Sequence, residues 1–282
     1  MSTRNINVKE VARAVEELFI EANTVLRQDV VSALKRLAEE EKNPKAKKML
    51  EILVENSKIA EKKSMPLCQD TGLAVVFLNI GRDVVFTEGY INEAVDKGVL
   101  NAYEKGFLRK SIVKDPVLRG NTGTNTPAFM HIEIVPGNKV EIIVLPKGFG
   151  SENKSGLAML NPTAGEDAIV DFCVEVVRKA GPDACPPYVL GVGIGGTAEV
   201  CGLLAKKALT RPIDSRNPQE HIARLEDEIE KKVKELEIGV MGLGGISTVM
   251  GVNIEIAPTH IAGLPVAVNL SCHALRSART VI

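Results

Sequence analysis

The sequence predicts an α+β fold in which a helical N-terminal region is followed by a mixed, partly antiparallel sheet with flanking helices. Two observations support this prediction. From about Val8 to Glu61 the apolar residues recur at helical spacing, whereas β-branched runs and alternating segments appear later in the chain. Helices that come first, with a mixed sheet after them, are typical of α+β architecture.

Helix boundaries in the N-terminal region can be read from capping signals. Asp29 is placed to cap a helix that runs through Ala38. Asn43 followed by Pro44 is the signature of a capped helix start with proline in the first turn. We therefore expect several consecutive helices before the first buried strand.

The pattern changes after this region. Leu73–Ile80 is a β-branched apolar run and predicts a buried strand, and a helix is expected over Tyr90–Lys105. His131–Val135 and Lys139–Val144 alternate in polarity around a Pro-Gly-Asn turn, which predicts an antiparallel hairpin. Further helices are expected over Ala164–Lys179 and Gln219–Leu236.

Domain organisation follows from length and composition. The 282 residues, 45% of them hydrophobic, are enough to bury a sizeable core, and no linker, repeat or low-complexity segment interrupts them. We predict a single domain over residues 1–282, with a helical part at 1–64 and a part at 65–282 that carries the binding residues.

Charge and hydropathy exclude two classes of partner. The 35 basic and 36 acidic residues are scattered, so no basic face for nucleic acid is expected. No apolar stretch approaches the length that a membrane span needs, and no signal peptide is seen, so we expect a cytoplasmic protein without a membrane partner. Five cysteines at irregular spacings indicate reduced thiols rather than disulfides.

Three of these cysteines, Cys68, Cys185 and Cys272, lie in turns rich in Gly, Pro or polar residues. Together they suggest one metal site, although each alone could be an ordinary loop thiol. Three thiolates on a cubane iron–sulfur cluster leave one iron without a protein ligand, and that open position makes a Lewis acid suited to a hydro-lyase. Cys173 and Cys201 lie within helical patterns and are expected to be packing residues.

Other segments allow more than one interpretation. Gly191–Gly196 fits the GxGxxG pattern, but Thr210–Pro218 is a turn where a dinucleotide-binding unit needs a second strand. The polar loops around Arg119 and over Lys147–Ser155 are either solvated turns or a pocket for a small dicarboxylate. His260, at the junction of two strand-like segments, is either structural or able to orient substrate and carry a proton.

Taken together, these segments resemble the α subunits of class I fumarate hydratases and of L-tartrate dehydratase. The matching pieces are PLCQDTG (66–72), RGNTGTNTP (119–127), LPKGFGSENKS (145–155), CPPYVLGVGIGGTAE (185–199), MGLGGIST (241–248) and APTHIAGLPVAVNLSCHALR (257–276). They occur in the same order as in the family and are spread from Pro66 to near the C-terminus, so the resemblance extends over about three quarters of the chain.

The resemblance implies a [4Fe–4S] cluster with one iron lacking a protein ligand, held by Cys68, Cys185 and Cys272. It implies that Gln69 and Asp70 line the site, with Asp70 in a hydrogen-bonding role near the catalytic base, and Asp70 and His260 are the implied catalytic residues. The substrate-binding residues implied are Gln69, Arg119, Gly148 and Gly150, and His260 is implied to contact the bound hydroxy acid. Phe149 departs from the family's run of glycines, which leaves open how the backbone approaches substrate there.

The resemblance also implies a reaction and a partner. The main prediction is the interconversion of (S)-malate and fumarate plus water, a step of the tricarboxylic acid cycle. The alternative is dehydration of L-tartrate to oxaloacetate, and lower alternatives are a non-enzymatic metal- or nucleotide-binding module. In the family the remaining cationic groups and a proposed base lie in a further domain or a β subunit. We therefore expect a heteromer whose active site needs a β subunit, with the pair dimerised again.

Overall fold

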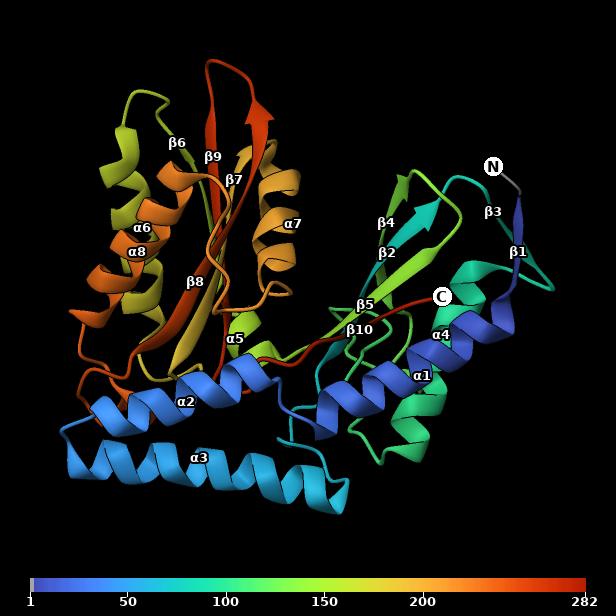
Figure 1. Cartoon of the computed structure of the whole chain (residues 1–282), viewed down its shortest axis with the longest axis horizontal. Coiled ribbons are helices and arrows are strands. Elements are labelled where there is room, and N and C mark those ends of the chain that lie inside the picture. Colours follow the sequence, from blue (N-terminus) through green and yellow to red (C-terminus); the bar gives the residue numbers. More distant parts are fainter. Residues whose placement is uncertain (1–2) are drawn as a thin grey trace. The chain divides into compact units, whose positions relative to one another are not determined.

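The computed structural model describes residues 3–282, shown in Figure 1. The chain divides into two compact units, which are described separately: unit 1 comprises Met1–Arg27, Ser57–Gly148 and Arg276–Ile282, and unit 2 comprises Gln28–Asn56 and Phe149–Leu275. Helices come first and two mixed sheets follow, so the predicted α+β fold is confirmed. The single domain with a boundary after residue 64 stays a prediction.

The N-terminal region is helical, as predicted. Its helices are α1 (Val8–Thr24), α2 (Gln28–Glu40) and α3 (Pro44–Lys63). Asn43 caps α3, because its Oδ1 accepts the amide of Lys45 at 3.0 Å. The predicted cap at Asp29 is wrong: α2 already begins at Gln28, and Oδ2 of Asp29 accepts the amide of Ile213 at 2.9 Å instead.

Unit 1 is built on a four-stranded sheet in the order β10-β5-β2-β4. Its elements are β2 (Leu73–Gly81), α4 (Ile91–Lys105), β4 (Phe129–Val135), β5 (Val140–Lys147) and β10 (Ala278–Val281), and a separate parallel pair is formed by β1 (Arg4–Asn7) and β3 (Val84–Thr87). Helices α1 and α4 pack on one face of the sheet, where Val15, Val95 and Val76 share one core. The buried run of β2 is therefore the centre of this unit.

The predicted hairpin between β4 and β5 is wrong. β2 lies between these two strands, parallel to β4 and antiparallel to β5. Their short connection passes over the end of β2, where the amide of Gly81 bonds to the carbonyl of Lys139 at 2.8 Å. The most apolar strand occupies the centre because both of its faces and both of its edges are then covered.

Unit 2 is built on a second four-stranded sheet, in the order β6-β9-β7-β8. Its elements are α5 (Phe149–Glu152), β6 (Gly156–Leu160), α6 (Gly165–Ala180), β7 (Tyr188–Gly196), α7 (Ala198–Ala208), α8 (Glu220–Lys234), the 3₁₀ turn η1 (Val240–Gly242), β8 (Val249–Thr259) and β9 (Leu264–Ser271). Helices α6 and α8 lie on one face and α7 on the other (Figure 1). The helices predicted over 164–179 and 219–236 correspond to α6 and α8 and are confirmed.

The glycine-rich segment after residue 190 lies inside β7 rather than in a turn. A Cβ atom on Gly191 would lie 2.0 Å from the carbonyl oxygen of Ala205, and one on Gly193 would lie 2.0 Å from that of Cys201. These glycines let α7 pack closely against the strand. The GxGxxG pattern here therefore serves packing, not a phosphate-binding turn.

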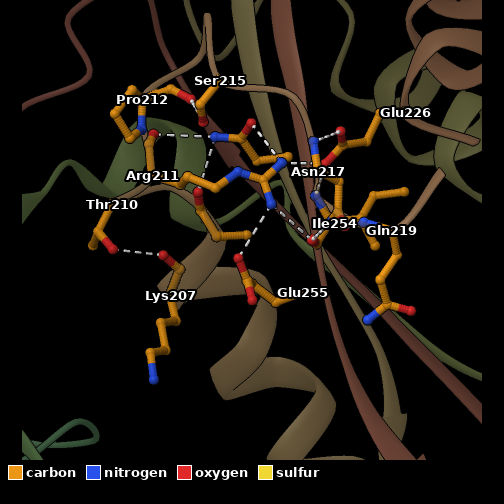
Figure 2. A network of polar contacts seen from close by, with 12 residues as sticks. Lys207, Thr210, Arg211, Pro212, Ser215, Asn217, Gln219, Glu226, Ile254 and Glu255 are labelled. Atoms are coloured by element: carbon orange, nitrogen blue, oxygen red, sulfur yellow. Dashed lines mark hydrogen bonds and ion pairs between the residues drawn. The ribbon is translucent and has the colours of Figure 1, made fainter. Parts of the chain in front are cut away.

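A polar network fixes the loop that follows α7 (Figure 2). The guanidinium of Arg211 donates to the carbonyl of Ile254 at 3.1 Å, pairs with Glu226 on α8 and reaches Glu255 on β8 at 3.3 Å. Because Arg211 bonds to both neighbouring elements, the turn predicted over 210–218 is held as a turn, and α8 follows it where a dinucleotide-binding unit would have a strand.

The two sheets share one spatial arrangement of strands, although the outer strand comes last in the chain in unit 1 (β10) and first in unit 2 (β6). In each, a central strand (β2 or β7) has a parallel neighbour (β4 or β8) on one side and an antiparallel neighbour (β5 or β9) on the other. A further strand, β10 or β6, completes each sheet antiparallel to β5 or β9. Between residues 3 and 282, none of the helices combines the length and apolar character that crossing a membrane requires.

Candidate functional site

In unit 1, the candidate residues Cys68, Gln69 and Asp70 lie together in the segment that enters β2. This segment, residues 66–72, has no helix or strand of its own. Cys68 is partly exposed and its Sγ lies 3.4 Å from Oε1 of the exposed Gln69. Oδ1 of Asp70 accepts the amide of Gly72 at 3.0 Å, which closes a short turn.

Buried side chains hold the carbonyl groups of this segment. The hydroxyl of Tyr103 on α4 donates to the carbonyls of Thr71 at 2.8 Å and Gly72 at 2.7 Å. Nη1 of Arg276, which is 3% exposed, donates to the carbonyl of Asp70 at 2.6 Å. Burial raises the pKa of Tyr103 above its ordinary value, so this phenol remains a donor.

The predicted substrate residue Arg119 lies in the long loop before β4. Its backbone is left-handed, with φ 63°, in a turn where Asp115 accepts the amides of Val117 and Leu118. Bonds from the Leu118 and Val117 amides lower the pKa of Asp115. The Arg119 side chain is exposed on this turn, so the structure presents it to solvent on an ordered loop.

Arg109, which the sequence analysis did not single out, begins the same loop. Its amide donates to Oγ1 of Thr71 at 2.9 Å, and its carbonyl accepts from that hydroxyl at 3.2 Å. Its side chain is exposed. A second arginine is therefore attached, through its backbone, to the segment that carries Cys68.

The candidate glycines lie just after β5. A Cβ atom on Gly148 would lie 3.3 Å from Nη2 of Arg276 and 3.3 Å from Oδ2 of Asp70, so Gly148 in unit 1 adjoins the Asp70 turn. Gly150 is exposed within α5 of unit 2, and no atom lies within 4 Å of its Cβ position. Phe149 begins α5 with helical backbone, which any residue adopts, so the expected glycine is not required there.

In unit 2, Cys185 and Cys272 come together although 87 positions separate them. The amide of His273 donates to the carbonyl of Cys185 at 3.2 Å. Cys185 has a left-handed backbone with φ 56°, which costs a non-glycine residue roughly 1–2 kcal/mol. Such an outlier at an exposed thiol supports a functional role. Burial, and to a smaller extent the two nearby thiols, raises the pKa of Tyr188 beside them.

The structure does not bring His260 to these two cysteines within unit 2. His260 lies in the turn between β8 and β9, whereas Cys272 follows the other end of β9. The eight residues of β9 span roughly 26 Å at about 3.3 Å each. His260 is exposed, and its Nδ1 accepts the amide of Ala262 at 3.1 Å, which assigns the ring proton to Nε2.

The remaining two cysteines are packing residues, as predicted. Cys173 on α6 and Cys201 on α7 are both fully buried. Burial raises the pKa of Cys173 to about 12 and also raises that of Cys201. No disulfide joins the five cysteines, all of which are among the described residues, and within residues 3–282 no group of three or more Cys, His, Asp or Glu is arranged as a metal site.

The residues that the sequence analysis missed are mainly those that hold the Cys68 segment. Arg276 is the last residue of the last matching piece, so the sequence contains a signal for it. Tyr103 and Arg109 lie in no motif, and only the fold places them beside Thr71.

Comparisons with known proteins agree with the resemblance. The sequence model described as "Fumarate hydratase (Fumerase)" matches residues 12–281. A Methanocaldococcus jannaschii protein, named as a candidate L(+)-tartrate dehydratase subunit alpha, is 44% identical and covers 95% of this chain and 96% of its own. The L(+)-tartrate dehydratase subunits alpha of Escherichia coli strain UTI89 and Shigella boydii serotype 4 are 34% and 33% identical, each covering 98% of this chain and 91% of its own. The chain therefore belongs to the fumarate hydratase (Fumerase) family of hydro-lyases.

Proposed function

We propose that this chain is the α subunit of an iron–sulfur hydro-lyase that dehydrates L-tartrate to oxaloacetate. The choice of L-tartrate as the substrate rests on similarity, over nearly the whole chain, to relatives named as L(+)-tartrate dehydratase subunits alpha. This proposal replaces the main prediction from the sequence, malate and fumarate, with its alternative. Malate and fumarate remain the second candidate, because the matching family model is described as fumarate hydratase.

The donor set fits the cluster that this function needs. Cys68 and Cys272 are partly exposed and Cys185 is exposed, whereas Cys173 and Cys201 are fully buried. Three accessible thiols in irregular segments suit a [4Fe–4S] cluster with one iron lacking a protein ligand. When bound, such a cluster would supply a Lewis acid for the departing hydroxide.

The residues of this chain would bind and orient the dicarboxylate. Removing water requires loss of a weakly acidic C–H proton, so negative charge develops toward the neighbouring carboxylate and must meet donors there. Arg119, the amides at Gly148 and Gly150, and the Gln69 amide group are the proposed donors. Arg109 is added to them, since its backbone is bonded to Thr71. Asp70 would hold a hydrogen bond to the group that moves the proton.

Under this proposal the His260 that contacts substrate cannot come from the same chain as the nearby Cys272. Because roughly 26 Å of β9 separate its turn from Cys272, a contact of His260 with substrate held near Cys272 would come from a second copy of the chain. This fits the expectation that the α–β pair dimerises again. Its exposed Nε2 would then act as a hydrogen-bond donor to the hydroxy acid.

A β subunit is part of the proposal. The relatives are named as alpha subunits, which implies a further subunit in those enzymes. The β subunit would supply the remaining cations and the base. We place the complex in the cytoplasm, where thiols stay reduced and available to iron.

The test is side-by-side turnover by the anaerobically assembled α–β complex. We expect about four iron and four sulfide per α chain. We also expect kcat/KM for L-tartrate at least about tenfold above that for (S)-malate, because a site built to bond a substrate hydroxyl discriminates against the analogue that lacks it. A tenfold preference for (S)-malate or fumarate would move the substrate to the second candidate. Activity equal to the complex in the α chain alone would refute the need for a β subunit.

The two lower alternatives predict different results. A zinc-binding or non-enzymatic module would tolerate serine equally at all five cysteines. A nucleotide-binding module would bind a dinucleotide and ignore iron, and the packing role of Gly191 and Gly193 argues against it.

A further inference from the structure

The segment that carries Cys68, Gln69 and Asp70 needs support from outside itself. It lacks helix and strand, so its backbone carbonyls have no ladder to bond to. Tyr103 and Asn125 bond to carbonyls at its C-terminal end, Gly72 accepting Nδ2 of Asn125 at 3.3 Å. At Asp70 the carbonyl is held by Arg276 at 2.6 Å, the shortest of these bonds.

Arg276 is itself fixed from its other side. Nη1 also donates to Oδ1 of Asn23 at 3.1 Å, and Asn23 is fully buried at the end of α1. Nδ2 of Asn23 donates to the carbonyl of Phe19 at 3.0 Å, so its amide can face Arg276 only through Oδ1. A chain of bonds therefore runs from α1 through Asn23 and Arg276 to the backbone of Asp70.

The same guanidinium also adjoins Gly148. The Cβ position of Gly148 is 3.3 Å from both Nη2 of Arg276 and Oδ2 of Asp70. A planar guanidinium offers donors in a fixed fork, so it can hold two groups at a set angle where lysine offers one mobile point charge. Two of the proposed substrate-site residues thus meet at one buried side chain.

We propose that Arg276 is a positioning residue, which sets the orientation of the Asp70 carboxylate by holding its main-chain carbonyl and confining the space beside Gly148. This inference rests on the proposed hydro-lyase function. Arg276 does not touch the reacting atoms in this assignment, and it acts through Asp70. Loss of an outer residue that orients a site residue typically costs 10- to 100-fold in activity or affinity.

The experiment compares Arg276→Ala and Arg276→Lys in the assembled α–β complex, with Arg279→Ala as the matched control. Arg279 is an exposed arginine three residues further on, in β10. For Arg276→Ala we expect kcat to fall about 10- to 100-fold with KM within about threefold and iron content unchanged. Guanidinium added at millimolar concentration raises kcat of Arg276→Ala at least fivefold, because it occupies the space left by the arginine side chain. Arg276→Lys gives an intermediate kcat and no response to guanidinium, and Arg279→Ala behaves as the native complex.

A second measurement does not depend on turnover. Hydrogen exchange of the isolated full α chain follows the amide of Gly72, which Asp70 accepts in the native turn. We expect its exchange to accelerate at least tenfold in Arg276→Lys and to be unchanged in Arg279→Ala. This arm also covers the case in which Arg276→Ala fails to fold.

The inference is overturned if kcat of Arg276→Ala stays within twofold of native. It is also overturned if the loss follows iron content alone without guanidinium rescue, or if Gly72 exchange is unchanged in Arg276→Lys. Failure of the proposed function looks different, since the native complex would then turn over neither L-tartrate nor (S)-malate. The exchange arm would still report whether Arg276 holds the Asp70 turn.

Discussion

The loops that enter the two central strands occupy equivalent places in sheets with the same spatial arrangement of strands, yet they are held by different kinds of bonds. The segment before β2 is fastened by the buried side chains of Tyr103 and Arg276. The segment before β7 is fastened largely by backbone: the amide of Cys185 bonds to the carbonyl of Pro182, and its carbonyl accepts the amide of His273. One side-chain hydroxyl, that of Tyr188, also donates to the carbonyl of Gly181 at the start of this segment. The carbonyls of the first loop thus depend on side chains from other elements, whereas the second loop depends more on backbone bonds and on the conformation of its own chain.

This difference teaches where each loop is vulnerable. A loop held by side chains can be loosened by a single atom replaced on another element, without a change in its own sequence. A loop held by backbone tolerates most side-chain changes but depends on glycines and unusual dihedral angles nearby. The candidate residues follow the same division, since Asp70 lies in the first loop and the left-handed Cys185 in the second.

The largest effect is expected when the thiols of the candidate site are themselves removed. Serine at Cys68, Cys185 or Cys272 is expected to lower iron from about four per chain to below about one, with loss of hydratase activity, because each thiolate is a proposed ligand. Iron analysis after anaerobic purification measures this. The control is Cys173→Ala, a buried thiol expected to cost about 1 kcal/mol of stability without loss of iron. Equal iron in all four variants would contradict the assignment.

A backbone effect is expected at Gly239, in the segment between α8 and β8 that borders the loop before β7: the amide of Met241 in this segment donates to the carbonyl of Pro186 at 3.0 Å. The dihedrals of Gly239, φ 69° and ψ 172°, belong to a region open essentially to glycine alone, and a Cβ there would lie 1.8 Å from the carbonyl oxygen of Gly244. Gly239→Ala is therefore expected to cost about 2–5 kcal/mol in urea unfolding. Gly202→Ala is the control, since no atom lies within 4 Å of its Cβ position. A loss below 1 kcal/mol at Gly239 would remove the backbone argument.

The side-chain-held loop is expected to weaken in Tyr103→Phe. This change removes one hydroxyl and leaves the carbonyls of Thr71 and Gly72 without that donor, which costs about 1–3 kcal/mol. Urea unfolding measures the loss, and hydrogen exchange across residues 68–72 localises it. Tyr90→Phe, at an exposed tyrosine, is the control and is expected to be neutral. If both variants unfold alike, the loop does not depend on Tyr103.

An effect of similar size that fades at low pH is expected at Glu41 in unit 2. Burial alone would raise the pKa of Glu41, but bonds from the Ser247 hydroxyl and the amides of Asn43 and Lys42 outweigh it, and the pKa is lowered. Since the folded pKa lies below the ordinary 4.5, this stabilisation is complete above about pH 5 and is lost as pH falls through the folded value.

Glu41→Gln is expected to cost about 1–3 kcal/mol at pH 7 and progressively less at pH 3 to 4, as the native carboxyl also becomes neutral. Urea unfolding of both proteins across this pH range measures the difference. If the free energies of unfolding of the native protein and Glu41→Gln differed by the same amount at every pH, Glu41 would stabilise unit 2 through packing and not through its charge.

Local signals predicted the helices better than the sheets. The cap at Asn43 depends on residues within one turn, so the sequence contains all of it. The hairpin at residues 131–144 was wrong because a short turn between two strands looks the same whether they pair directly or flank a third strand. Only the long-range pairing of β2 with both decides between these arrangements.

The site follows the same rule. Motifs identify Cys68, Asp70 and Cys185. The resemblance to the family implies that Cys185 and Cys272 come together, which agrees with the bond between the Cys185 carbonyl and the His273 amide. Tyr103 and Arg276 could not be assigned, since a phenol or a guanidinium becomes an anchor only through the partner that the fold brings to it.

Unit 1 consists of three segments that are separated in the chain, and this affects the order in which the two units can be completed during synthesis. Its first 27 residues, its middle portion and strand β10 belong to one compact unit, but residues 149–275 are synthesised before β10. At usual translation rates that delay is on the order of ten seconds. During this time the edge of β5 that β10 will cover is open to other strands. All residues of unit 2 are thus synthesised before β10, so unit 1 is the later of the two units to be completed.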